Sequence, residues 1–255
     1  MTSMISIMAD LGEGYGAYSM GDDLALLDVI SSANVACGFH AGDPIIMERV
    51  VKACVERGVS IGAHPGFYDL RGFGRRTIAA SPDEIRTDII YQVGALGAFA
   101  QSHGTDLSHV TPHGRLGNLA IESLEYAEPV AEAIAGLPVR LPVATLEGHL
   151  ARLARERDLD VAIIGFADRA YHKNGTLVSR REPGAVLHDP VAIAERVVRM
   201  ATEHVVETIE GDTLAIRCDS ILVHGDTPRA VEIAQHVRAS LEGAGVTVVP
   251  LPTVL

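Results

Sequence analysis

The sequence has no tryptophan, and its aromatic residues make up only 4% of the chain. Its three cysteines are Cys37, Cys54 and Cys218, an odd number that cannot pair completely in disulfides. None of them stands in a Cys-x-x-Cys arrangement. This pattern argues against a disulfide-stapled fold and against a structural zinc knuckle.

Basic residues are also scarce, because 21 Lys and Arg stand against 33 Asp and Glu, for a net charge of −12. Nucleic-acid-binding proteins usually carry a basic face, so no nucleic-acid partner is expected. No uninterrupted apolar stretch approaches the roughly 20 residues that a membrane helix needs. Residues 1–15 lack a basic start followed by a long apolar run, which predicts no signal peptide. We therefore expect a cytoplasmic protein that does not bind membranes.

The hydrophobic share, 47% of 255 residues, is enough for a large core. No Pro-, Ser- or Gly-rich linker divides the chain, so we expect one domain over residues 1–255. Short apolar runs are predicted to be strands, and the longer amphipathic stretches between them to be helices. The predicted strands are residues 5–8, 59–63, 109–112, 140–143, 160–164, 214–217, 221–224 and 247–250. The predicted helices are residues 24–30, 44–57, 82–102, 146–157, 191–206 and 230–241.

Alternating strands and helices indicate a parallel α/β sheet, which is either a closed (β/α) barrel or an open Rossmann-type sheet. The open sheet would carry a Gly-x-Gly-x-x-Gly loop that leads directly into a helix. Residues 12–16, Gly-Glu-Gly-Tyr-Gly, lack that spacing. The barrel is therefore favoured. Because no Gly-x-x-x-x-Gly-Lys-Ser/Thr motif exists, independent nucleotide binding is unsupported.

Polar segments, five of the six with a glycine, recur directly after the apolar runs. They are residues 10–13, 36–43, 62–66, 111–114, 166–169 and 223–226. In parallel α/β proteins the carboxyl ends of the strands meet on one face, where binding sites are built. We therefore expect these segments to surround one polar pocket for a small molecule.

Among the 11 histidines, His40, His64, His113 and His224 stand in these segments and are each followed within two residues by glycine, which lets the backbone approach a ligand closely. We expect these four to share the site. The remaining histidines lie in predicted helices or loops, or for His109 at the start of a predicted strand, without special neighbours and are expected to be structural or exposed: His103, His109, His149, His172, His188, His204 and His236.

Two kinds of chemistry are open to such a site. Asp10, His40 and His64 could hold a divalent metal that activates water. The same groups could act without metal, with a histidine as general base and a carboxylate that orients it. Arg75 and Arg76 could clamp a substrate carboxylate or phosphate through bidentate pairing, or belong to a solvated loop.

At these segments the sequence resembles the LamB/YcsF family. The resemblance runs in order from about Ile5 to about Gly245, nearly the whole chain. The segments that carry it are Ser32–Pro44, Gly62–Phe67, Gly72–Arg76, Phe166–Tyr171 and Val223–Asp226.

The resemblance implies a seven-stranded, TIM-like (β/α) barrel of the deacetylase type. It also implies the role of the A subunit in an ATP-dependent 5-oxoprolinase, which hydrolyses the lactam of 5-oxo-L-proline to L-glutamate. ATP would be a co-substrate, two carboxylase-like subunits would be partners, and a homo-oligomer is left open. The catalytic residues implied are Asp10, His40, His64 and His113. The substrate-binding residues implied are Glu13, Asn34, Asp43, Arg75, Arg76, Asp168, Arg169 and His224.

The chain departs from the family pattern at pocket positions. Met8 replaces an asparagine, Thr111 a lysine, Gly117 a tyrosine and Ile164 a glutamate. Loss of the lysine together with the glutamate would avoid leaving one unpaired buried charge. A divergent member is therefore expected. The alternatives are a metal-dependent deacetylase or amidohydrolase on the same barrel and a non-catalytic small-molecule-binding paralogue.

Overall fold

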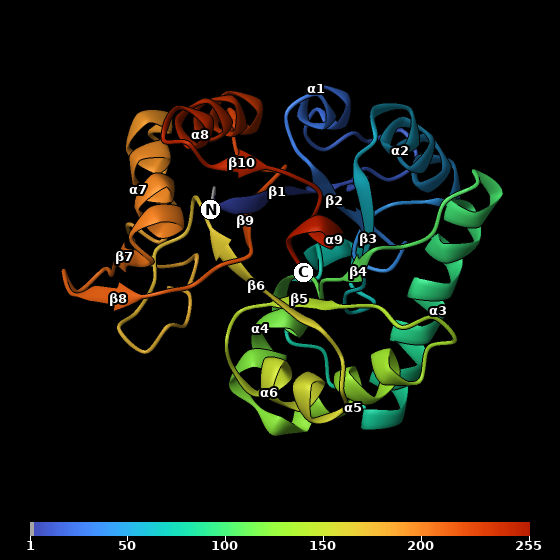
Figure 1. Ribbon diagram of the computed structural model, residues 1–255. Helices are drawn as coiled ribbons and strands as arrows, with labels where there is room; N and C mark the ends of the chain where they lie inside the picture. Colours follow the sequence, from blue (N-terminus) through green and yellow to red (C-terminus); the bar gives the residue numbers. More distant parts are fainter. Residues whose placement is uncertain (1–2) are drawn as a thin grey trace.

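The computed structural model describes residues 3–255, and a ring of parallel strands forms its centre (Figure 1). Within these residues seven strands close the ring in the order β1, β2, β3, β4, β5, β6 and β9, with β9 paired back to β1. A further strand, β10, pairs with the start of β1. This is the predicted seven-stranded (β/α) barrel. The strands are β1 Met4–Leu11, β2 Ser32–Ala36, β3 Ser60–His64, β4 His109–Val110, β5 Val143–Thr145, β6 Val161–Phe166, β9 Ser220–Val223 and β10 Thr247–Val248.

Helices α1 to α8 lie around the ring, and the short α9 lies against its interior, where Leu251 packs (Figure 1). They are α1 Asp23–Leu27, α2 Pro44–Arg57, α3 Pro82–Ser102, α4 Gly114–Glu122, α5 Leu124–Ala135, α6 His149–Glu156, α7 Pro190–Thr202, α8 Ala230–Gly243 and α9 Leu251–Val254, with a 3₁₀ turn η1 at Leu70–Gly72. The boundaries of α2 and the capping box that opens α3, formed by Ser81 and Glu84, follow from the sequence as predicted. None of the helices in the described residues is long and apolar enough to cross a membrane.

Strand β1 shows how the barrel is filled. Ile5, Ile7 and Ala9 join the large core between the sheet and the surrounding helices. The alternate residue Met8 faces the barrel interior, where it packs with Ile164, Leu222 and Leu251. Both faces are therefore covered, which explains why β1 is apolar almost throughout. Asp10 stands on the same inward face, two residues nearer the carboxyl end.

Two predicted elements differ from the structure, since one strand forms outside the ring and one helix ends early. The segment predicted as a strand at residues 214–217 forms β8, Thr213–Ala215, which pairs antiparallel with β7, Val205–Glu207, outside the ring. The helix predicted for 191–206 ends at Thr202, and His204 takes a left-handed conformation with φ of 58°. The β-branched Val205 and Val206 then continue as a strand. Helices α4 and α5 occupy residues for which no element is predicted, because two glycines in α4 and a proline within α5 weaken the helical signal.

Candidate active site

A cavity of about 870 Å³ opens at the carboxyl ends of the barrel strands. Seven of the predicted site residues line it: Asp10, His64, Arg75, Arg76, His113, Arg169 and His224. The other predicted residues do not line it: Glu13, Asn34, His40 and Asp168 are buried, and Asp43 is half-buried at the start of α2. The strand-end segments therefore converge as the sequence predicts.

Asp10 is held by a buried chain of hydrogen bonds across the barrel. Asn34 Nδ2 donates to Asp10 Oδ1 at 2.9 Å, and Asn34 Oδ1 accepts from His109 Nε2 at 2.8 Å. Burial lowers the pKa of His109 to about 3. His109 stands in β4, at the strand predicted for residues 109–112, and is structural, but the expectation that it has no special neighbours is wrong because it faces inward and contacts Asn34. Gly62 makes this possible, since a Cβ there would lie 2.1 Å from His109 Nε2.

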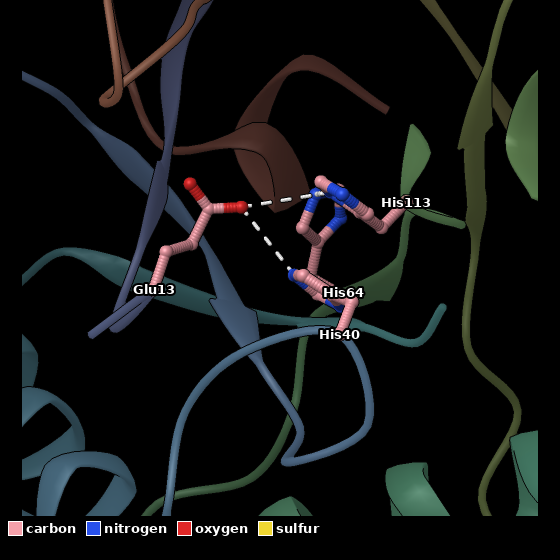
Figure 2. Close-up of side chains that lie close together, drawn as sticks. All are labelled: Glu13, His40, His64 and His113. Carbon is pink, nitrogen blue, oxygen red and sulfur yellow. Dashed lines mark hydrogen bonds and ion pairs between the residues drawn. The ribbon is translucent and has the colours of Figure 1, made fainter. Parts of the chain in front are cut away.

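Four buried side chains gather beside Asp10. Figure 2 shows Glu13 facing the rings of His40, His64 and His113. Glu13 Oε1 lies 3.3 Å from His40 Nε2 and 3.5 Å from His113 Nδ1, and His113 Nδ1 lies 2.9 Å from His64 Nε2. The rings of His40 and His113 stack at 3.6 Å. Among the described residues, these four place their ligand atoms within 4.8 Å of one another.

This cluster shares His40 and His64 with the predicted metal ligands and adds Glu13 and His113. Asp10 is not a member, although its Oδ1 lies 3.4 Å from His64 Nε2. Desolvation by burial holds the pKa of His40 and His113 well below the usual value and lowers the pKa of His64. Burial raises the pKa of Glu13, and the nearby Asp10 adds to the effect.

Across the cavity His224 is oriented by Asp168. Asp168 Oδ1 accepts a hydrogen bond from His224 Nδ1 at 2.7 Å, and Oδ2 accepts one from Thr227 Oγ1 at 2.8 Å. Burial alone would raise the pKa of Asp168, but the charge of His224 and these two hydrogen bonds lower it to about 2. Asp168 is thus a buried carboxylate that fixes His224 and leaves the Nε2 atom of the ring for the cavity.

The two arginines predicted to clamp a substrate differ in their surroundings. Arg75 Nη2 pairs with Asp226 Oδ2 at 2.7 Å at the cavity wall. Arg76 donates through Nε to Asp69 Oδ1 at 3.0 Å and also pairs with it through Nη2, so the Asp69 carboxylate already satisfies it. Of the two, Arg75 is the better placed for a ligand.

Two further arginines lie on the same wall. Arg169 is buried and donates to the carbonyl oxygens of Val178 at 2.6 Å and Ala185 at 3.3 Å, which orders the loop after β6. Arg180 lines the cavity, and its Nη2 is buried without a hydrogen-bond partner in residues 3–255. Sequence reasoning missed Arg180, because the flanking Ser179 and Arg181 make this stretch typical of a solvated loop.

Asp43, predicted to bind substrate, is engaged with backbone. Its Oδ1 accepts from the amides of Ile45 at 2.9 Å and Ile46 at 3.0 Å, and its Oδ2 accepts from Gly16 at 2.8 Å. It therefore caps α2 and ties the loop after β1 to that helix.

The departures from the family pattern lie in or under the cavity. Thr111 and Ile164 line it, as expected for pocket positions. The Oγ1 atom of Thr111 is buried with no hydrogen-bond partner in the described chain. Met8 lies beneath, where its sulfur accepts a 3.5 Å contact from Asn34 Nδ2. At Met8 and Ile164 apolar side chains thus stand where the family pattern has polar groups.

Comparisons with known proteins agree on one family. The sequence pattern that defines the LamB/YcsF family matches residues 5–255. The A subunit of the 5-oxoprolinase of Pyrococcus abyssi is 48% identical over 248 residues, 97% of each chain. The structure of a lactam utilization protein from Thermus thermophilus superposes with a TM-score of 0.91 at 42% identity, covering 96% of this chain and 99% of that one. A T48 deacetylase with substrate, 16% identical and covering 99% of this chain and 90% of that one, has a TM-score of 0.51 and shows the shared fold alone.

Proposed function

Because this chain belongs to the LamB/YcsF family, we propose that it is the A subunit of an ATP-dependent 5-oxoprolinase that converts 5-oxo-L-proline to L-glutamate. One observation carries the proposal. A carboxylate, a histidine cluster, an oriented Asp–His pair and an arginine whose Nη2 has no hydrogen-bond partner in residues 3–255 gather at one cavity. Identity of 48% over nearly the whole length of a 5-oxoprolinase A subunit supports it.

The chemistry explains why ATP is needed. An unstrained five-membered lactam resists hydrolysis, and phosphorylation of the lactam oxygen activates its carbonyl carbon. Water then adds to that carbon, and the C–N bond breaks as the ring nitrogen takes a proton and the bonding electron pair. This leaves a γ-glutamyl phosphate, which a second water hydrolyses to glutamate and phosphate. Because this chain has no nucleotide-binding motif, we assign the phosphorylation to two carboxylase-like partner subunits.

Protonation of the ring nitrogen decides the outcome. If the first adduct expelled phosphate instead, the starting lactam would simply reform. His224 stands at the cavity with Asp168 on its Nδ1 atom, which stabilises the charged ring and leaves Nε2 to pass a proton to the nitrogen. Asp10, held by Asn34 next to His64, is placed to accept a proton from the attacking water.

The substrate also carries a carboxylate, and we assign it to Arg180 with Arg75. The unpaired Nη2 of Arg180 offers a donor that no group in the described chain satisfies. A charge-assisted hydrogen bond of this kind contributes about 1.5–3 kcal/mol. Arg180→Gln should therefore raise KM roughly 10- to 100-fold with a smaller effect on kcat.

The test measures glutamate release from 5-oxo-L-proline and ATP with this chain and its two candidate partner subunits. Release that requires every component, and that falls in Arg180→Gln but not in the exposed control Arg140→Gln, is the expected result. No release, while a family-typical A subunit is active in the same mixture, would refute the assignment. The absence of release would then be due to the altered positions Met8, Thr111 and Ile164.

A second candidate function is a metal-dependent amidohydrolase, which the Glu13–histidine cluster favours. Such an enzyme would release product alone, without partners or ATP. Lactam binding without turnover in any combination would instead indicate a non-catalytic paralogue. The same assay, run with this chain alone and with calorimetric titration of the lactam, separates these outcomes.

A further inference from the structure

The cluster of Glu13, His40, His64 and His113 brings together acceptor atoms for which the surrounding described residues supply no hydrogen-bond donor. His64 Nδ1 lies 2.6 Å from the carbonyl oxygen of Thr111, which can only accept. The hydrogen of neutral His64 is therefore on Nδ1, and its Nε2 carries a lone pair. His113 Nε2 likewise lies 2.9 Å from the carbonyl oxygen of Phe73, so its Nδ1 carries a lone pair.

These two lone pairs face each other. His113 Nδ1 and His64 Nε2 are 2.9 Å apart, which is a hydrogen-bond distance. Neither atom carries a hydrogen, because the one hydrogen of each neutral ring is donated to a carbonyl oxygen on its other side. Glu13 Oε1, a third acceptor, lies 3.5 Å from His113 Nδ1. A positive charge between these atoms resolves the conflict.

His40, the fourth residue of the cluster, also indicates a bound positive charge. Both ring nitrogens of His40 and the Oε1 atom of Glu13 are buried without a hydrogen-bond partner among residues 3–255. His40 Nε2 points at Glu13 Oε1 from 3.3 Å (Figure 2). The stacking of His40 on His113 and the close approach of Gly74 hold the ring in place, since a Cβ at Gly74 would lie 2.8 Å from His40 Cβ.

We propose that Glu13, His40, His64 and His113 together bind one divalent transition-metal ion. Three imidazoles and one carboxylate are the donors that zinc prefers, whereas magnesium and calcium favour oxygen ligands. The Thr111 and Phe73 carbonyl groups fix the tautomers of two ligands from behind, which is a common arrangement in protein metal sites. Asp10 stays outside the ligand set, since its Oδ1 is held by Asn34.

The ion would stand at the floor of the substrate cavity, which His64 and His113 line. When bound, it would supply Lewis-acid polarisation of an oxygen on the substrate. The proposal shares its cavity with the proposed function but does not depend on which lactam is hydrolysed.

The test uses the full chain, treated with a chelator, dialysed and titrated with ZnCl₂ in a calorimeter, or with CoCl₂ while its visible absorption is recorded. We expect about one ion per chain, cobalt bands typical of a four-coordinate site, and a rise in melting temperature with zinc. Glu13→Gln and His113→Gln should each weaken binding at least about tenfold. His236→Ala, an exposed histidine on α8, is the matched control and should bind as the wild type does.

Failure of the folded, metal-free wild type to bind either ion at about one equivalent would overturn the proposal and would leave a shared proton as the charge in the cluster. Unchanged affinity in both Gln variants would overturn it as well, and circular dichroism checks that each variant is folded. Glutamate release separates the two claims. Binding without release leaves the metal site standing and refutes the proposed function, whereas release without binding does the reverse.

Discussion

Asp168 offers the sharpest test of the electrostatics of the site. Its pKa falls from an ordinary value of 3.8 to about 2 in the folded protein, so the folded state favours the carboxylate. Because one pKa unit corresponds to about 1.36 kcal/mol, the difference is worth about 2 kcal/mol. A carboxyl group with a depressed pKa stabilises the fold above its unfolded pKa. That stability is lost as the pH falls through the folded value.

Asp168→Asn should therefore lower the free energy of unfolding by about 2 kcal/mol at pH 7. The gap to the wild type should stay constant down to about pH 4 and narrow below it, toward pH 2. Urea unfolding followed by circular dichroism across this range measures the gap. The exposed Asp106→Asn serves as a control for the loss of one charge. A gap of less than about 0.5 kcal/mol at pH 7, within the range of ordinary surface substitutions, would refute the reasoning.

Three further predictions follow from particular contacts. His64→Ala should reduce glutamate release at least about tenfold in the complete mixture, because it removes the ring beside Asp10; a smaller loss would rule out its assigned role. Gly62→Ala should displace His109 and so break the hydrogen bond from His109 Nε2 to Asn34 Oδ1. We expect a destabilisation of about 1–3 kcal/mol in thermal unfolding and a lower kcat. Gly58→Ala places a Cβ in open space but at φ of +67°, so it should cost about 1 kcal/mol and leave kcat unchanged; a loss of kcat would contradict this account.

The barrel is predictable from the sequence because the signals for its helices and strands lie within each element. Capping residues such as Asp43 and Ser81 mark helix starts, and apolar runs mark strands. The antiparallel pair β7–β8 is harder to predict, since short β-branched runs look alike inside and outside a ring. The assignment of residues 1–255 to one domain stays a prediction.

A neighbouring glycine at a strand end is one sequence signal for a site residue, but it does not mark all of them. This signal identifies His64 and His113, whereas His109 lacks a glycine beside it in the sequence. The glycine that makes room for it, Gly62, comes from a neighbouring strand. The feature that marks Arg180 is that its Nη2 atom has no hydrogen-bond partner in the described residues. Only the folded structure reveals this.

The closure of the ring has a consequence for how the protein acquires activity. Ser6 of β1 lies in register with Ser220 of β9, so the final seam joins segments more than 200 residues apart. Contacts over such a separation form late and slowly, because a long loop must close before they can stabilise anything. Asp10 stands on β1, and His224 directly follows β9. Catalytic activity should thus appear only when the seam has closed, at the last folding event. Neither half of the chain alone should be active.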